Sequence, residues 1–444
     1  VWFSSISSRG LLAWISGILL TLFYIALYWY PEYLGLGNGE EANTGLVALF
    51  DPFSLFLKNE KASQWFVYGT FYTLAILLFG IKFIIKYRHN RYQVIRTISV
   101  IFFQTAFAFI IPEIMLRLNQ PYMDLKNVWP LNYYFFFDWN LTNMISSGSF
   151  GLFMLVWGIA LIFIVTPTLT YFYGKRWYCS WVCGCGGLAE TAGDPFRHLS
   201  DKSLNAWNFE RYIIHGVLLF VTVMTLGVLY NFFSNSQGNY LLGKPFFLII
   251  SMALIAIPNF WIILDRNRFK ELDKIGQYGI HISSGLIILF LLNGLFTAPQ
   301  DLFFIDGFKM RKWYGFLIGA AFSGVIGVGF YPIMGSRVWC RFGCPMAAIL
   351  GIQQRFFSRF RITTNGGQCI SCGNCSTYCE MGIDVKSYAQ KGQNIVRASC
   401  VGCGICSAVC PRGVLKLEND KNDGPSRTDH KPISLGNDGI SIDL

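Results

Sequence analysis

Long apolar stretches constrain this chain more than any other feature. Eight of them are long enough to cross a membrane core about 30 Å thick at about 1.5 Å per helical residue. Their approximate limits are Leu11–Tyr30, Trp65–Lys86, Ile95–Leu116, Phe150–Tyr173, Tyr212–Phe232, Pro245–Leu264, Tyr278–Leu295 and Trp313–Met334. Because unpaired backbone groups are costly in lipid, the stretches predict an all-α integral membrane bundle of about eight transmembrane helices.

The charge pattern favours a lipid environment over a nucleic-acid partner. The 444 residues are 53% hydrophobic and 14% charged, with a net charge of +11. Basic residues gather after the second and sixth stretches: Lys86, Arg88, Arg91 and Arg96, then Arg266, Arg268, Lys270 and Lys274. Because cytoplasmic loops collect Lys and Arg, we expect a multi-pass protein of the bacterial inner membrane. Both termini and the loops after the fourth and eighth stretches would then be cytoplasmic.

The two long connections on the opposite side, 31–64 and 117–148, are rich in aromatic residues. The second contains a run from Trp129 to Phe137, which is typical of an interfacial belt. A docking surface for an external partner is the alternative. Glu113 and Arg117, spaced i, i+4 at the end of the third stretch, predict a local salt bridge.

Two cysteine runs have the spacing of bacterial ferredoxins. In such runs three close thiolates hold one [4Fe–4S] cluster and the fourth cysteine reaches the other cluster. We therefore assign one cluster to Cys369, Cys372, Cys375 and Cys410, and a second to Cys400, Cys403, Cys406 and Cys379. Zinc ribbons need only two Cys-x2-Cys pairs, fewer than these runs supply. Glu380 stands where proline often follows the fourth cysteine.

An internal repeat links the remaining cysteines. Gly174–Cys183 and Gly335–Cys344 both read Gly-x-Arg-x-aromatic-Cys-x3-Cys, at the ends of the fourth and eighth stretches. We predict two parallel repeats of four helices, whose axis along the membrane normal brings the turns together. The turns would form one metal or Fe–S site with the ligands Cys179, Cys183, Cys340 and Cys344. Buried free thiols and a redox disulfide within each turn are alternatives, and the role of Cys185 stays open.

The sequence suggests four regions and one small-molecule site. The transmembrane domain would span 1–345, a linker 346–365, a small α+β ferredoxin domain 366–418, and a polar tail 419–444. His215 and His281 lie at the predicted cytoplasmic ends of their stretches. They would be interfacial histidines satisfied by backbone or lipid, or they would bind quinol, because a neutral imidazole accepts a hydroxyl proton.

The two turns, followed by the double ferredoxin run, resemble the NosR/NapH/CcoG group of membrane-bound polyferredoxins over roughly residues 65–418. The segment around Trp129-Pro130-Leu131 looks most like NosR and its relatives in reductive dehalogenation clusters. Gly184 departs from the proline that this group carries after the first turn. NosR also has an external domain with covalent FMN, so FMN is expected only if such a domain is missing from this chain.

The resemblance implies a redox carrier or oxidoreductase subunit of anaerobic respiration, not a stand-alone enzyme, and we assign no catalytic residue. Electrons would pass between the quinol pool or a cytoplasmic donor and an external reductase such as nitrous oxide reductase. Alternatives are a copper assembly or reduction factor, as in the CcoG branch, or a subunit of another respiratory or dehalogenating complex. The expected partners are membrane lipid, quinol and an external reductase or assembly partner, and no nucleic acid.

Overall fold

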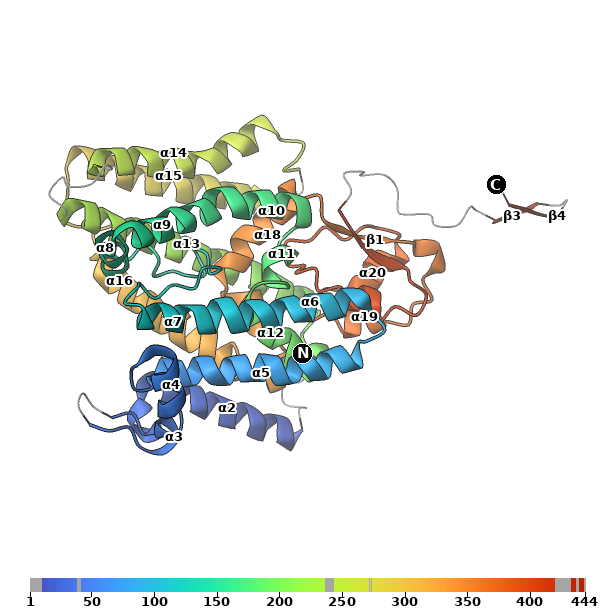
Figure 1. The fold of residues 1–444 in the computed structure, drawn as a ribbon. Coiled ribbons are helices and arrows are strands. Elements are labelled where there is room, and N and C mark those ends of the chain that lie inside the picture. The colour runs from blue at the N-terminus through green and yellow to red at the C-terminus, as the bar shows by residue number, and fades with distance from the viewer. Residues whose placement is uncertain are drawn as a thin grey trace.

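The computed structural model describes residues 10–37, 41–235, 243–270, 272, 274–419, 433–436 and 439–442. Long helices lie side by side in a bundle, and a small domain with short strands packs against one end of it (Figure 1). We call this the ferredoxin end and the opposite one the far end. The basic connection between α5 and α6 lies at the ferredoxin end, because Tyr92 and Gln93 hydrogen-bond to Gly402 and Cys403 of the small domain.

Seven helices in the described part of the chain are long and apolar enough to cross a membrane. The first two are α2 (Leu11–Trp29) and α5 (Gln64–Lys86). The next two are composite: α6 (Arg91–Phe102), η2 (Phe103–Ile110) and α7 (Ile111–Arg117), then α9 (Gly148–Ala160), η3 (Leu161–Val165) and α10 (Thr166–Tyr173). The second half supplies α13 (Leu204–Asn235), α14 (Lys244–Leu264) and α15 (Lys274–Phe296).

The eighth predicted stretch differs from the expectation. Its helix begins earlier, as α16 (Gly307–Tyr314), and continues as η5 (Gly315–Ile326). Turns follow, and α17 (Tyr331–Met334) is separate. Charged residues in α16 and the glycines and proline between 327 and 332 explain why the apolar run is not one uninterrupted spanning helix. The structure therefore supports a membrane protein with seven candidate spans, and the eighth stays a prediction.

Residues 346–365, which we expected to be a linker, have regular secondary structure. They form α18 (Pro345–Phe357) and β1 (Arg361–Thr364). Leu350 of α18 is fully buried, so an apolar face, not chain flexibility, determines this segment. β1 pairs antiparallel with β2 (Leu415–Glu418), and α19 (Asn374–Thr377), α20 (Val385–Gln390) and α21 (Ile405–Ala408) lie between them. The expected polar tail contains an antiparallel pair, β3 (Ile433–Gly436) and β4 (Gly439–Ile442).

One hydrophobic core joins the bundle to the small domain. It contains Cys179 and Cys340 from the two cysteine turns, Leu350 from α18, and Ile362 and Val401 from the small domain. The ferredoxin region is therefore packed on the bundle as part of the same folded body.

The first long connection caps the far end with η1 (Pro31–Leu34), α3 (Gly45–Ala48) and α4 (Asp51–Lys58). Lys58 of α4 places its Nζ 3.5 Å from Glu113 Oε2, and both side chains are buried. Arg117 instead donates to the carbonyl of Phe56 at 2.7 Å. The predicted Glu113–Arg117 bridge is thus wrong, because α4 brings a buried cation to the carboxylate.

The second long connection turns back into the bundle, and we call residues 118–137 the re-entrant segment. Trp157 of α9 donates to the carbonyl of Leu125 at 3.0 Å. Trp129 donates to Thr225 Oγ1 of α13 at 3.1 Å. Trp129 of the aromatic run therefore packs within the bundle, and the interfacial belt stays a prediction. Irregular backbone within a membrane is tolerated where protein encloses it.

Candidate iron–sulfur sites

The first ferredoxin cavity lies near the surface of the small domain. Its lining includes four cysteines with the basic residues Lys386 and Arg412; the cysteines are Cys369, Cys372, Cys375 and Cys410. Ser371 and Gly373 have positive φ values of 59° and 81°, which wrap the loop around the cavity. These are the four cysteines that the sequence spacing assigns to one cluster.

The second cavity is lined by the other four cysteines of the ferredoxin runs, Cys379, Cys400, Cys403 and Cys406. The N–H of Ile383 donates to Cys379 Sγ at 3.4 Å, a contact typical of cluster-binding loops. Burial raises the pKa of the Cys406 thiol well above its usual range. Metal coordination removes that penalty by deprotonating the thiols, so both donor sets fit an iron–sulfur cluster.

The two cavities differ in exposure. Cys372 in the first cavity is exposed, whereas the bundle covers the loop of the second. Four side chains of the bundle donate to carbonyls of that loop: Tyr92 to Gly402 (2.9 Å), Gln93 to Cys403 (2.9 Å), Ser180 to Val401 (2.9 Å) and Gln354 to Cys400 (2.7 Å). The second cavity therefore faces the bundle, and the first faces solvent.

The two repeated turns have matching backbone geometry. Each begins at a glycine with positive φ, 66° at Gly174 and 100° at Gly335. In each turn the last cysteine donates to a carbonyl five residues earlier, at 2.8 Å for Cys183 and 2.9 Å for Cys344. These two cysteines are also the N-cap residues of the helices that follow, α12 (Gly184–Thr191) and α18. The sequence repeat thus corresponds to a repeat of local structure.

The structure brings the cysteines of both turns into one buried group. Cys179, Cys183, Cys340 and Cys344 share a hydrophobic core cluster, with Cys185 at its edge. Burial raises the pKa of the Cys344 thiol, and the nearby thiols of Cys340, Cys179 and Cys183 raise it further. We call these four residues the four-cysteine group; their chemistry suits a soft metal or an Fe–S cluster.

Cys183 differs from the others of the group. A hydrogen bond with Cys185 lowers its pKa to about 6 although burial opposes this, and the ammonium of Lys126 acts in the same direction. Lys126 lies on the re-entrant segment and pairs with Asp124 at 2.9 Å. The next residue, Asn127, accepts a hydrogen bond from Tyr178 of the first turn at 3.3 Å. A segment that starts at the far end thus reaches the four-cysteine group.

Gly184 replaces the proline of the second turn for a steric reason. A Cβ atom at Gly184 would lie 2.2 Å from Gln104 Oε1 and 3.3 Å from Tyr72. Gln104 is buried and donates to Thr73 Oγ1 at 3.2 Å. The helices α5 and α6–η2 therefore close over the first turn where the second turn has room for Pro345.

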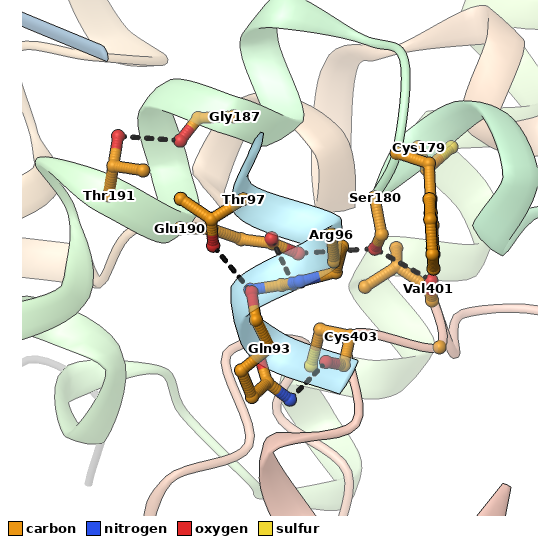
Figure 2. A network of polar contacts seen from close by, with 12 residues as sticks. Gln93, Arg96, Thr97, Cys179, Ser180, Gly187, Glu190, Thr191, Val401 and Cys403 are labelled. Atoms are coloured by element: carbon orange, nitrogen blue, oxygen red, sulfur yellow. Dashed lines mark hydrogen bonds and ion pairs between the residues drawn. The ribbon is translucent and has the colours of Figure 1, made fainter. Parts of the chain in front are cut away.

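A buried network of ion pairs separates the second cavity from the four-cysteine group. Arg96 of α6 and Arg337 of the second turn both pair with Glu190 of α12. Glu380, which follows Cys379, pairs with Arg337 at 2.9 Å and with Arg197 of η4 (Asp194–Leu199) at 2.7 Å. Figure 2 shows Arg96 and Glu190 between Cys403 of the small domain and Ser180 of the first turn.

The network governs the charge of its carboxyl groups. Burial opposes ionisation of Glu380, yet Arg197 and Arg337 lower its pKa to about 2. Burial raises the pKa of Glu190, although the positive charges of Arg96 and Arg337 act to lower it. Sequence reasoning did not identify these residues as part of a site. The available signals were the arginine repeated in both turns and Glu380 in place of proline.

The two predicted quinol-site histidines have separate partners. His215 Nδ1 lies 2.6 Å from the carbonyl of Arg211 on its own helix, and His281 Nδ1 lies 2.7 Å from Asn259 Oδ1 of α14. A neutral ring that donates from Nδ1 carries its lone pair on Nε2. Each imidazole can thus accept a hydrogen bond at Nε2, and the Nδ1 partners described here do not join either ring to the cysteines.

Comparison with known proteins supports the iron–sulfur assignment. Residues 368–415 match the family described as 4Fe-4S dicluster domain. The family described as 4Fe-4S binding domain matches twice, over residues 153–203 and 315–363, so each match contains one of the repeated turns. The "Putative electron transport protein YccM" of Escherichia coli (strain K12) is 37% identical over 54 residues, which are 12% of this chain and 15% of that protein. No solved structure matches significantly. The chain is therefore a mostly helical protein with 4Fe-4S ferredoxin-type regions and an iron–sulfur electron-transfer role.

Proposed function

We propose that this chain carries electrons between a donor at its ferredoxin end and a partner reductase at its far end. The observation that carries the proposal is the continuous buried core that holds the second cavity and the four-cysteine group together. [4Fe–4S] clusters, when bound, supply the electron carriers. The protein holds them in sequence, with the exposed first cavity as the port for a donor and the four-cysteine group deepest in the bundle.

The basic loops support a cytoplasmic ferredoxin end in a bacterial inner membrane. The donor would be a cytoplasmic carrier, or quinol bound near His215 or His281. The partner would be an external reductase, such as nitrous oxide reductase or the reductase of a dehalogenating complex. The re-entrant segment supports transfer toward the far end, because Lys126 and Asn127 bring that side of the molecule to the cysteine turns.

A second candidate is copper reduction or assembly of a copper site. The hydrogen-bonded pair of Cys183 and Cys185 favours it, because buried soft thiolates select Cu(I). In that case the four-cysteine group would bind copper, and iron would be confined to the two ferredoxin cavities.

Proteoliposomes with an entrapped electron acceptor test the lead proposal. The full chain is purified without oxygen, inserted into vesicles, and reduced from outside with dithionite while reduction of entrapped cytochrome c is followed. We expect reduction that depends on Cys340, with Cys340→Ser as the matched variant. Iron in both ferredoxin cavities without transfer across the vesicle membrane would contradict the proposal. Copper in the four-cysteine group would establish the second candidate.

A further inference from the structure

The guanidinium of Arg337 contacts three parts of the molecule at once. Arg337 belongs to the second turn and is 1% exposed. Its Nη1 lies 3.6 Å from Cys340 Sγ and 3.3 Å from the carbonyl oxygen of Cys179 in the first turn. Its Nη2 pairs with Glu190 and lies 2.9 Å from Glu380 Oε1 of the small domain. One side chain therefore connects both turns to the ferredoxin region.

The carboxylate partners of Arg337 adjoin the second cavity. Glu380 directly follows Cys379, a lining residue of that cavity. Carboxylate oxygens of Glu190 and Glu380 and the Sγ of Cys403 all lie within 4.8 Å of one another. Arg337 thus stands between two sets of thiols, with Cys340 on one side and, through its carboxylate partners, Cys403 on the other.

The guanidiniums of the network outnumber its fully buried carboxylates. Three guanidiniums, those of Arg96, Arg197 and Arg337, face two carboxylates, those of Glu190 and Glu380. Asp194, which is partly exposed, pairs with Arg197 and with Lys86 at the surface. Asp194 compensates Arg197, whereas Arg337 shares Glu190 with Arg96 and Glu380 with Arg197. The negative charge of cysteine-ligated clusters, which increases on reduction, would add to the compensation of Arg337 on both sides.

We propose that Arg337 is a positioning residue that holds the second cavity against the four-cysteine group and favours the reduced state at both. The inference rests on the proposed electron-transfer function. It also gives Glu380 a reason to occupy the place of the usual proline, because a proline there would leave Arg337 and Arg197 without their shared carboxylate.

The test compares Arg337→Gln with Arg337→Lys in the full chain, in detergent and without oxygen. Redox titration followed by electron paramagnetic resonance measures midpoint potentials, and hydrogen exchange measures protection of α12 and residues 400–406. Arg337→Gln should lower the potential of the second-cavity signal and of any four-cysteine signal, leave the first-cavity signal unchanged, and weaken protection. Arg337→Lys should keep the potentials near those of the unmodified protein while protection still falls.

Arg341→Gln is the matched control. Arg341 lies in the same turn, is buried, and pairs with Glu210 at 2.7 Å. Its loss should destabilise the chain, shift the potentials less than Arg337→Gln does, and leave the hydrogen exchange of α12 unchanged. Equal effects of Arg337→Gln and Arg341→Gln, or unshifted potentials in an iron-loaded Arg337→Gln protein, would overturn the inference. Failure of the proposed electron-transfer function would give a different result, namely vesicles with iron-loaded protein that transfer no electrons. In a chain that loads no iron, equal hydrogen exchange in the two variants alone refutes the positioning role.

Discussion

The two cysteine turns have the same backbone and different surroundings. Gly174 and Gly335 begin them alike, and Cys183 and Cys344 cap the next helices alike. The corresponding arginines differ: Arg337 is buried among carboxylates, whereas Arg176 stacks its guanidinium 4.6 Å from the ring of Phe360 and bonds to exposed Asn419. A repeat thus preserves the geometry that gathers thiols, while the neighbours of each copy determine charge and packing.

The shared four-cysteine site gives the largest expected effect. Cys179→Ser and Cys340→Ser come from different turns, and each should remove the same spectroscopic signal completely. Cys369→Ser serves as the control, because it should alter only the signal of the first cavity. Two separate signals, or an unchanged metal content in both variants, would show that the turns act independently. Structural thiols or local disulfides would then replace the shared site.

The two arginines should differ strongly in their contribution to stability. Arg337→Gln leaves Glu190 and Glu380 buried with less compensation, so we expect a loss of about 3–5 kcal/mol in the free energy of unfolding. Arg176→Gln removes a partly exposed stacking contact and should cost about 1 kcal/mol or less. Unfolding of both variants by titration with dodecyl sulfate measures the difference. Similar losses would mean that the ion network contributes little.

The residue after each turn offers a steric comparison. Gly184→Pro should cost about 1–3 kcal/mol, because the ring would displace buried Gln104. Pro345→Gly should cost about 1–2 kcal/mol, because it raises the entropy of the unfolded chain and removes a buried ring. The same unfolding assay applies. Adding Gln104→Ala to Gly184→Pro should recover part of the loss, and no recovery would place the strain elsewhere.

The tie between the first turn and the re-entrant segment gives the smallest expected effect. Tyr178→Phe removes the hydrogen bond to Asn127 and should cost about 1 kcal/mol. Hydrogen exchange within residues 118–137 should rise, whereas Tyr173→Phe, at an exposed site, should leave it unchanged. Unaltered exchange in the Tyr178→Phe protein would mean that Trp129 and Leu125 hold the segment without this contact.

Short sequence patterns predicted the parts of this molecule that form through interactions between residues close together in the chain. Apolar runs predicted the seven candidate spans because a helix satisfies its own backbone, and cysteine spacing anticipated which thiols line each cavity. The linker expected at 346–365 does not include the burial of Leu350, because that burial depends on the packed bundle.

Long-range partners explain what the sequence did not reveal. Arg96, Glu190 and Glu380 are far apart in the chain, and an isolated charge in a sequence is usually solvated. Similarly, the aromatic run at Trp129 has the composition of an interface, and its packing against α13, with the bond of Trp129 to Thr225, shows that it enters the bundle. The network and the re-entrant segment are products of tertiary packing.

The re-entrant segment also imposes an order on the making of this protein. Trp129 can form its hydrogen bond within the bundle only after Thr225, its partner in the second half of the chain, has been synthesised. Cys179 and Cys183 likewise leave the ribosome long before Cys340 and Cys344 exist to join them. On the shared-site proposal, a metal donor that acts on the nascent first half would find only half of the ligands. Metal would therefore bind at that site only after Cys340 and Cys344 have been synthesised. A chain truncated anywhere before residue 340 should carry no metal at its first cysteine turn.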